Sequence, residues 1–148
     1  VTFHARFCAL ARSYQYTLIN RPSPLMLDRA QAWWVYDPLN LEEMQKAANL
    51  LLGTHDFSTF RDSQCQASSP IKTLDQCDII QDGETFWINV KAKSFLHHQV
   101  RNMVGSLVSV GTGKWCVEDF KAAFEAKDRR RAGVTAPAGG LTFMSVEY

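Results

Sequence analysis

Residues 71–94 constrain the fold of this chain more than any other stretch, because they have the pattern of a long antiparallel hairpin. Two runs of strand-forming residues, 71–80 and 85–94, are separated by Asp82-Gly83, a dipeptide typical of tight hairpin turns. In the second run, Phe86, Ile88, Val90 and Ala92 alternate with Trp87, Asn89, Lys91 and Lys93. Strict alternation puts one set of side chains in a core and the other set toward solvent. The hairpin therefore predicts a sheet with one covered face.

Further extended patterns flank this hairpin in the sequence. Residues 3–20 form one extended segment that ends at Arg21-Pro22-Ser23-Pro24, because proline removes a backbone donor and constrains the residue before it. Residues 30–36 are rich in aromatic side chains and fit either a strand or an irregular docking segment, and residues 141–147 predict a last strand. A long polar stretch, 55–69, is expected to be an irregular loop of the kind that often carries function.

Three segments have helical periodicity. The clearest follows Asn40, a capping residue with Glu43 at capping-box spacing, and is expected to stop at Gly53; the others are 97–111 and 117–127. Their apolar stripes are Leu41, Met44, Ala47, Ala48, Leu51 and Leu52; Val100, Met103, Val104, Leu107 and Val108; and Val117, Phe120, Ala123 and Phe124. We predict an α+β fold, an antiparallel sheet of four to five strands with helices packed on one face.

Length and composition bound the class of protein. The 148 residues suit a single domain, 1–148, or two small ones at most. A composition of 46% hydrophobic and 21% charged residues excludes a disordered chain or a coiled coil. No apolar run approaches the roughly 20 residues of a membrane-spanning helix. The first six residues, Val1 to Arg6, contain neither an apolar signal core nor an initiating Met, so we expect a fragment of a longer polypeptide.

The charges and cysteines exclude fewer classes of protein than the length and composition do. Sixteen basic and fifteen acidic residues give a net charge of +1, which neither requires nor forbids a nucleic-acid partner. The four cysteines, Cys8, Cys65, Cys77 and Cys116, contain no Cys-x-x-Cys pair, and only Cys65 and Cys77 with His97 and His98 make a conceivable metal set. We expect free or buried thiols, no metal site and a cytoplasmic protein.

Searches for catalytic motifs find no Gly-rich phosphate loop, no Gly-x-Ser-x-Gly and no His-Glu-x-x-His. Glu125 and Asp128 precede a triple arginine and are expected to be structural ion-pair partners. One constellation stands out at the start of the second helix, where His97, His98 and Arg101 cluster at helical spacing. Together with the helix N-terminus they could bind a phosphate or carboxylate, although a solvated Arg101 fits the pattern equally well.

Basic residues interleaved with aromatic residues suggest that the protein binds RNA. Arg12, Tyr14 and Tyr16 share one face of the first strand, where they either pack across the sheet or present a ring to an unpaired base. The other basic residues in this pattern are Arg61, Lys72, Lys91, Lys93, Arg101 and the run 129–131. Positive side chains supply affinity for phosphates, and an exposed ring such as Tyr14 can stack on a base.

Four blocks, in order along the chain, resemble the C-terminal portion of the tRNA pseudouridine synthase A family. They are Phe-His-Ala-Arg-Phe at 3–7 running into Ala-Arg-Ser-Tyr-Gln-Tyr at 11–16, Leu-Gly-Thr-His-Asp-Phe-Ser-Thr-Phe-Arg at 52–61, Phe-Leu-His-His-Gln-Val-Arg-Asn-Met-Val-Gly at 95–105, and Thr-Ala-Pro-Ala-Gly-Gly-Leu at 135–141. The resemblance covers essentially all 148 residues. It implies an antiparallel sheet with flanking helices, and cofactor-free isomerisation of uridine to pseudouridine in the anticodon stem-loop of tRNA.

The family's chemistry depends on the aspartate of an Arg-Thr-Asp-Ala-Gly motif, which this sequence does not contain. By the resemblance, Tyr14 packs against the target base and Arg101 pairs with that aspartate, which lies upstream of the first block in the family. The candidate RNA contacts are Arg12, Arg61, His97, His98, Arg129 and Arg130. Family members act as homodimers on tRNA. Two alternatives remain open from the sequence, a non-catalytic RNA-binding module of the same fold and a plain scaffold whose aromatic rings are all core.

Overall fold

The computed structural model describes residues 11–23, 31–61, 69–96 and 98–147. Their strands are β1 (Ala11–Asn20), β2 (Trp33–Val35), β3 (Gly53–Asp56), β4 (Ile71–Asp82), β5 (Thr85–Ala92) and β6 (Leu141–Glu147). The α-helices are α2 (Leu41–Asn49), α3 (Gln99–Gly111) and α4 (Val117–Glu125), and three short 3₁₀ turns are η1 (Ser58–Phe60), η2 (Arg129–Arg131) and η3 (Ala138–Gly140).

The six strands form one sheet in the order β2-β1-β5-β4-β3. β6 also pairs with β1: it runs antiparallel to Ala11–Tyr16, while β2 runs parallel to Leu18–Asn20. The β1–β5, β4–β5 and β3–β4 pairs are antiparallel. The predicted α+β class is therefore confirmed, with six strands in place of four to five and with one short parallel pair.

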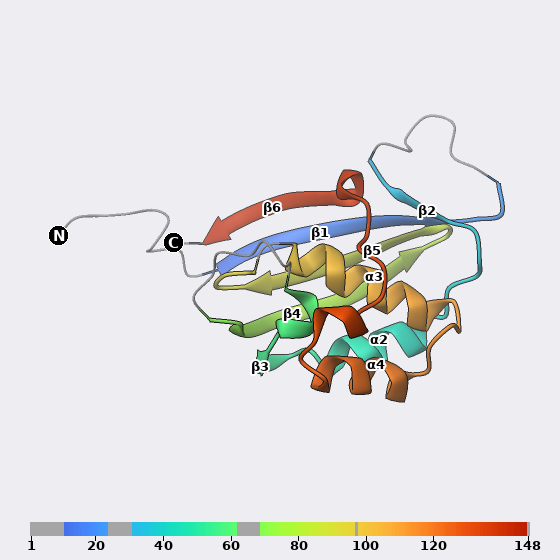
Figure 1. The fold of residues 1–148 in the computed structure, drawn as a ribbon. Coiled ribbons are helices and arrows are strands. Elements are labelled where there is room, and N and C mark those ends of the chain that lie inside the picture. Colours follow the sequence, from blue (N-terminus) through green and yellow to red (C-terminus); the bar gives the residue numbers. More distant parts are fainter. Residues whose placement is uncertain (1–10, 24–30, 62–68, 97, 148) are drawn as a thin grey trace.

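The core lies between the sheet and the three α-helices, which are grouped on one side of it (Figure 1). Alternation along β5 has the predicted consequence, since its four apolar side chains are at most 2% exposed. The predicted stripe of α3 is buried as well, and so are Phe120, Ala123 and Phe124 of α4. Burying these stripes against one sheet face is the main source of stability in such a layered domain.

Several predicted boundaries were wrong by a few residues. α2 ends at Asn49, and Gly53, with a φ of 95°, opens β3 instead of ending the helix. The stretch 55–69 is therefore not wholly irregular, because β3 and η1 lie within it. The hairpin turn is Gly83-Glu84, one residue later than predicted, with Gly83 at a φ of 62°. Such a positive φ favours glycine, so the turn forms where Gly83 can occupy it.

The caps explain how the helices begin. Asn40 caps α2 as predicted, because its Oδ1 accepts a hydrogen bond from the Glu43 backbone N–H at 3.2 Å. α3 begins at Gln99, two residues after the predicted start, and His98 before it adopts a left-handed conformation with a φ of 59°. The Gln99 side chain accepts the Leu96 N–H at 2.9 Å and so closes the turn that leads into the helix.

Both cysteines in the described part of the chain are free thiols, as predicted. Cys77 is buried on β4 and Cys116 is exposed before α4, whereas Cys8 and Cys65 lie outside the described residues. Burial raises the pKa of the Cys77 thiol to about 12, so this side chain behaves as a small apolar group. Within the described ranges, no helix combines the length and the apolar character needed to cross a membrane.

Candidate functional site

The N-terminal half of α3, which carries Arg101, lies near the end of the sheet where β1 begins (Figure 1). On β1, Tyr16 and Leu18 face the helices and are fully buried. Tyr14 and Arg12 share that face but are half-buried, because they lie closer to the end of the strand. The same sheet face therefore changes from core to accessible surface within a few residues.

Tyr14 lies in a cluster of three aromatic rings. Its ring makes edge-to-face contacts with Phe95 and with Phe143, each with 5.4 Å between ring centroids. Phe95 belongs to the segment that leads into α3, and Phe143 lies opposite Tyr14 on β6. Phe143 is 51% exposed, so the cluster opens to solvent on that side. Two supporting rings fix the orientation of the Tyr14 ring while part of it stays accessible.

Arg101 is held in the first turns of α3 by a single main-chain residue. Its Nε donates a hydrogen bond to the Ala136 carbonyl at 2.7 Å, and the Ala136 N–H donates to the Arg101 carbonyl at 3.1 Å. The side chain is half-buried. Among the described residues, no carboxylate lies within ion-pair distance of it and none accepts a hydrogen bond from its Nη atoms. The outer edge of the guanidinium is thus an unused two-pronged donor.

Tyr16 connects the buried sheet face to the same loop. Its hydroxyl donates a hydrogen bond to the Pro137 carbonyl at 2.5 Å, next to the carbonyl that receives Arg101. Burial raises the pKa of Tyr16, and the nearby positive charge of Arg101 opposes this only in part. The phenol therefore stays protonated and acts as a hydrogen-bond donor.

The loop from Gly133 to Gly140 can lie this close because small residues face it. A Cβ on Gly105 of α3 would lie 1.5 Å from the Val134 carbonyl oxygen, and a Cβ on Gly140 would lie 2.7 Å from the Tyr16 ring. The Gly133 N–H donates to the hydroxyl of Ser106, a buried residue, at 2.9 Å. Glycine at these positions lets the loop backbone approach the helix and the ring.

The candidate RNA contacts lie in separate parts of the structure, and the first group lies near the start of β1. Arg12 donates from Nη1 to the Lys93 carbonyl at 2.8 Å, and Lys72 donates to the Ser94 hydroxyl at 3.0 Å. Both side chains thus bind the segment that follows β5, and Arg12 puts positive charge two residues from Tyr14 on the same face of β1. His98 is half-buried immediately before α3, and His97 lies outside the described residues.

A second basic group, Arg61 and Arg129, is connected to α3 through Asn102. Arg61 follows η1, whose last carbonyl, that of Phe60, accepts a hydrogen bond from Asn102 at 2.8 Å. Arg129 donates from Nη2 to the Asn102 side chain and to Thr135. Arg129 thus participates in an internal network, in addition to being a candidate RNA contact.

Arg130 is the most accessible of these arginines, with a side chain that is 89% exposed. It pairs with Asp128 at 2.9 Å, as predicted for that carboxylate, and hydrogen bonds from Arg130 lower the Asp128 pKa. Glu125 pairs instead with Lys121, at 3.9 Å. Exposed pairs of this kind contribute little to stability, so Arg130 can exchange its partner for a phosphate at low cost.

Sequence reasoning missed the participation of the loop and of the supporting rings. The Ala136 and Pro137 carbonyls carry no side-chain signature, so no sequence pattern could have assigned them to Arg101 and Tyr16. Phe143 could have been found, since an aromatic residue in a predicted last strand is a candidate for cross-strand pairing. Tyr16 was noted on the right face, but its buried contact with Pro137 depends on the tertiary fold.

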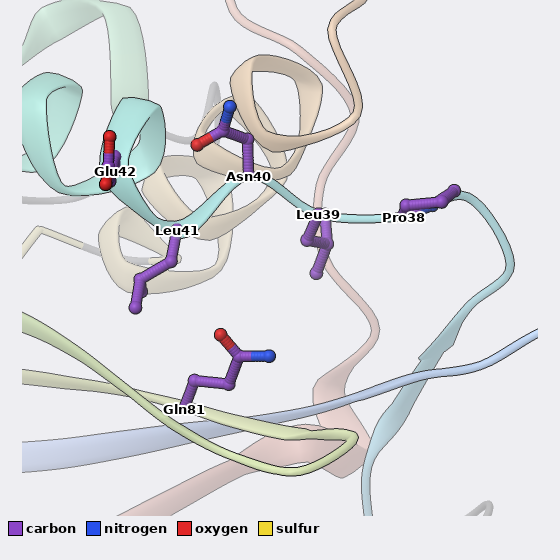
Figure 2. Close-up of a pocket in the computed structure, with 6 residues that line it drawn as sticks. All are labelled: Pro38, Leu39, Asn40, Leu41, Glu42 and Gln81. Carbon is purple, nitrogen blue, oxygen red and sulfur yellow. The ribbon is translucent and has the colours of Figure 1, made fainter.

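An open pocket of about 630 Å³ lies away from this site, at the hairpin end of the sheet. Figure 2 shows Gln81 of β4 facing the segment from Pro38 to Glu42 that enters α2. The backbone N–H of Asn40 in that segment donates to the carbonyl of Gly111, the last residue of α3, at 2.8 Å. The pocket thus lies at the opposite end of α3 from Arg101, and no predicted site residue lines it.

Comparisons with known proteins show which family the sequence resembles. The sequence profile of a family described as tRNA pseudouridine synthase matches residues 47–148. Proteins named tRNA pseudouridine synthase A from Paramagnetospirillum magneticum, Methylocella silvestris and Maricaulis maris are each 55% identical to the chain over 146 residues. The alignments cover 99% of this chain and 57%, 59% and 59% of those relatives. The chain therefore spans less than two thirds of the length of the relatives it matches.

Proposed function

This chain belongs to the tRNA pseudouridine synthase family, and we propose that it forms the part of such an enzyme that holds the target uridine and supplies the arginine partner of a catalytic aspartate. The substrate in this proposal is uridine in the anticodon stem-loop of tRNA, and the reaction is its isomerisation to pseudouridine without a cofactor. A target base that is stacked in the RNA has to be flipped out before its glycosidic bond can be reached.

One observation carries the proposal, the orientation of Arg101. Its Nε is bound to the Ala136 carbonyl, and neither of its Nη atoms has an acceptor among the described residues. An arginine with a fixed Nε and an unused Nη edge is suited to a carboxylate, which accepts two parallel N–H bonds. The half-buried position makes such a pair stronger than one at the surface.

We propose that this carboxylate is the aspartate of an Arg-Thr-Asp-Ala-Gly motif in another part of the complete protein. The 148 residues contain no such motif, and they match 57–59% of the length of the relatives above. In this arrangement Arg101 keeps the aspartate ionised and oriented, so that it can attack the flipped nucleotide while the base detaches, rotates and rejoins through C5. The chain alone is then inactive.

Tyr14 is the proposed platform for the flipped base. Its ring is half-buried and held by Phe95 and Phe143, and it lies two residues from Tyr16, which donates to the Pro137 carbonyl beside the Ala136 carbonyl that receives Arg101. A base stacked on Tyr14 would therefore lie on the Arg101 side of the sheet. Ring-to-base stacking contributes roughly 1–3 kcal/mol per base, enough to offset much of the cost of unstacking.

The remaining proposed contacts are electrostatic. Arg12, Arg61, His97, His98, Arg129 and Arg130 would meet phosphates on either side of the flipped base. Arg129 already uses Nη2 internally, so we expect it to contribute less than the exposed Arg130. We further propose that the complete protein acts as a homodimer in the cytoplasm, where the free thiols of Cys77 and Cys116 would stay reduced.

The test is pseudouridine formation on tRNA by the complete gene product that contains these residues, compared with residues 1–148 alone. We expect product from the complete protein and none from the shorter chain, which should still bind tRNA with a steep dependence on salt. Product from the shorter chain would contradict an external nucleophile. Binding by both without product from either would favour the non-catalytic RNA-binding module.

A further inference from the structure

Three side chains from separate parts of the chain form a closed hydrogen-bonded triangle beside α3. Thr135 Oγ1 donates to Asn102 Oδ1 at 2.6 Å, and Arg129 Nη2 donates to both of these oxygens, at 2.7 Å to Thr135 and 3.1 Å to Asn102. Asn102 is 1% exposed, and its Nδ2 donates to the Phe60 carbonyl at 2.8 Å. The donors and acceptors are mutually consistent, because arginine only donates and a carbonyl only accepts.

This triangle adjoins the residue that orients Arg101. Asn102 follows Arg101 on α3, and Thr135 precedes Ala136 in the loop. The two adjacent loop residues are therefore tied to two adjacent helix residues, Thr135 to the Asn102 side chain and Ala136 to Arg101. The bond between Thr135 and Asn102 therefore restrains the position of the neighbouring Ala136 carbonyl relative to α3.

We propose that Asn102, Thr135 and Arg129 are positioning residues that fix the Ala136 carbonyl and thereby aim the Arg101 guanidinium at its carboxylate partner. This inference rests on the proposed function for the identity of that partner. It also assigns Arg129 a role inside the protein that differs from phosphate binding.

The physical reason is the freedom of an arginine side chain. An arginine held only at its backbone has roughly 2 kcal/mol of rotamer entropy to lose before it can bind a carboxylate through both Nη atoms. A fixed acceptor at Nε removes most of that freedom in advance, because the guanidinium is planar and one bond sets the direction of its outer edge. Buried polar networks whose members are all satisfied are rigid, and no buried side-chain polar atom in the described residues lacks a partner.

The test compares Thr135→Val with Thr135→Ser in the complete gene product. Valine keeps the shape of threonine but removes the hydroxyl that joins Asn102 to the loop, whereas serine keeps the hydroxyl. For Thr135→Val we expect kcat for pseudouridine formation to fall about tenfold to a hundredfold with KM changed less than about twofold. Thr135→Ser should restore kcat to within about threefold of wild type.

A second readout follows Arg101 without relying on activity. In the wild type, the Nε–H of Arg101 is bonded to Ala136 and its NMR signal, assigned with Arg101→Lys, should exchange slowly with solvent. Thr135→Val should accelerate this exchange by at least about tenfold, and Thr135→Ser should not. Arg129→Gln, which removes two of the three bonds, should shift both readouts in the same direction and serves if Thr135→Val does not fold.

The control for a merely structural role is Gln45→Leu. Gln45 joins α2 to β4 through bonds to the Cys77 carbonyl at 3.1 Å and the Ile79 N–H at 2.8 Å, and it belongs to no part of the Arg101 network. It should lower Tm as much as Thr135→Val while leaving kcat and the Arg101 signal unchanged.

The outcomes separate this inference from the proposed function. An unchanged Arg101 Nε–H exchange in both Thr135→Val and Arg129→Gln would overturn the positioning role, and so would an equal loss of kcat in Gln45→Leu at an equal loss of Tm. If the wild type forms no pseudouridine, the proposed function fails by itself. Faster Nε–H exchange in Thr135→Val would then still support the positioning of Arg101.

Discussion

The two ends of α3 contact the rest of the protein through different kinds of groups. At the N-terminal end, Arg101 and Asn102 are held by hydrogen bonds to main-chain and polar groups of the loop from Gly133 to Gly140. At the C-terminal end, Gly111 packs against the side chains of Met44 and Leu39. The first end keeps an unused donor edge half-buried, whereas the second end packs against apolar side chains and is joined to the segment before α2 by a main-chain hydrogen bond from Asn40 to Gly111. The hydrogen bonds at the N-terminal end depend on direction, whereas the apolar contacts at the C-terminal end tolerate small shifts of the side chains.

The largest expected effect is on the polar end. Arg101→Ala should reduce pseudouridine formation by the complete protein at least about a thousandfold, because it removes the proposed partner of the nucleophile. Tm should change by only a few degrees, since Arg101 is half-buried and makes one side-chain hydrogen bond. Single-turnover assays and thermal melts would measure both. A variant that keeps wild-type turnover would remove Arg101 from the chemistry.

The same substitution at the two ends should have different consequences. A Cβ on Gly105 would overlap the Val134 carbonyl, which is backbone, so Gly105→Ala should displace the loop and destabilise the fold by about 3 kcal/mol. A Cβ on Gly111 would meet the Met44 Sδ at 2.5 Å and the Leu39 Cδ2 and Met44 Cγ at 2.8 Å, all of which are side-chain atoms and none backbone. The better helix propensity of alanine offsets this contact, so Gly111→Ala should change stability by no more than about 1 kcal/mol.

Urea unfolding of Gly105→Ala and Gly111→Ala would measure the difference between their free energies of unfolding. We also expect Gly105→Ala, but not Gly111→Ala, to lower turnover of the folded protein. Equal losses of stability at the two positions would show that the backbone facing Gly105 and the side chains facing Gly111 adapt to an added methyl group equally well.

Tyr16→Phe should produce an intermediate effect that depends on pH. Below pH about 10 the variant should be less stable by about 1–2 kcal/mol, because the Pro137 carbonyl loses its donor. Burial raises the pKa of Tyr16 above that of an unfolded tyrosine, so its contribution is complete below the unfolded pKa of about 10 and is lost as pH rises toward the folded value. The stability difference from wild type should therefore shrink between about pH 10 and pH 12. A constant difference across this range would show that the phenol is not buried as described.

The smallest effect is expected for Tyr14→Phe. The described residues provide no hydrogen-bond partner for the Tyr14 hydroxyl, and the ring contacts with Phe95 and Phe143 do not need it. The variant should fold normally and lose no more than about tenfold in turnover, while Tyr14→Ala should lose far more, because the stacking surface is gone. Equal turnover in Tyr14→Phe and wild type would limit the role of Tyr14 to its ring.

Much of the layered fold was predictable from local patterns. The alternation in β5, the cap at Asn40 and the stripe of α3 each follow from the period of the side chains along the element. The boundaries that failed did so where a few residues decide between alternatives, as at Gly53, which begins a strand at a φ of 95° instead of ending α2. The parallel pairing of β2 with β1 joins segments across a connection that no local pattern describes.

In the candidate site, too, some features follow from local sequence patterns and others depend on the fold. Local patterns were enough to identify the available chemical groups, a strand face with Arg12, Tyr14 and Tyr16 and a helix start with Arg101, because side-chain periodicity is a local property. The partners of these groups depend on the folded chain, since the carbonyls of Ala136 and Pro137 lie 35 and 121 residues from Arg101 and Tyr16. Main-chain carbonyls are alike at every position in a sequence. Which of them receives a given donor depends on how the chain packs, and here it is the loop beside α3 that sets the direction of Arg101.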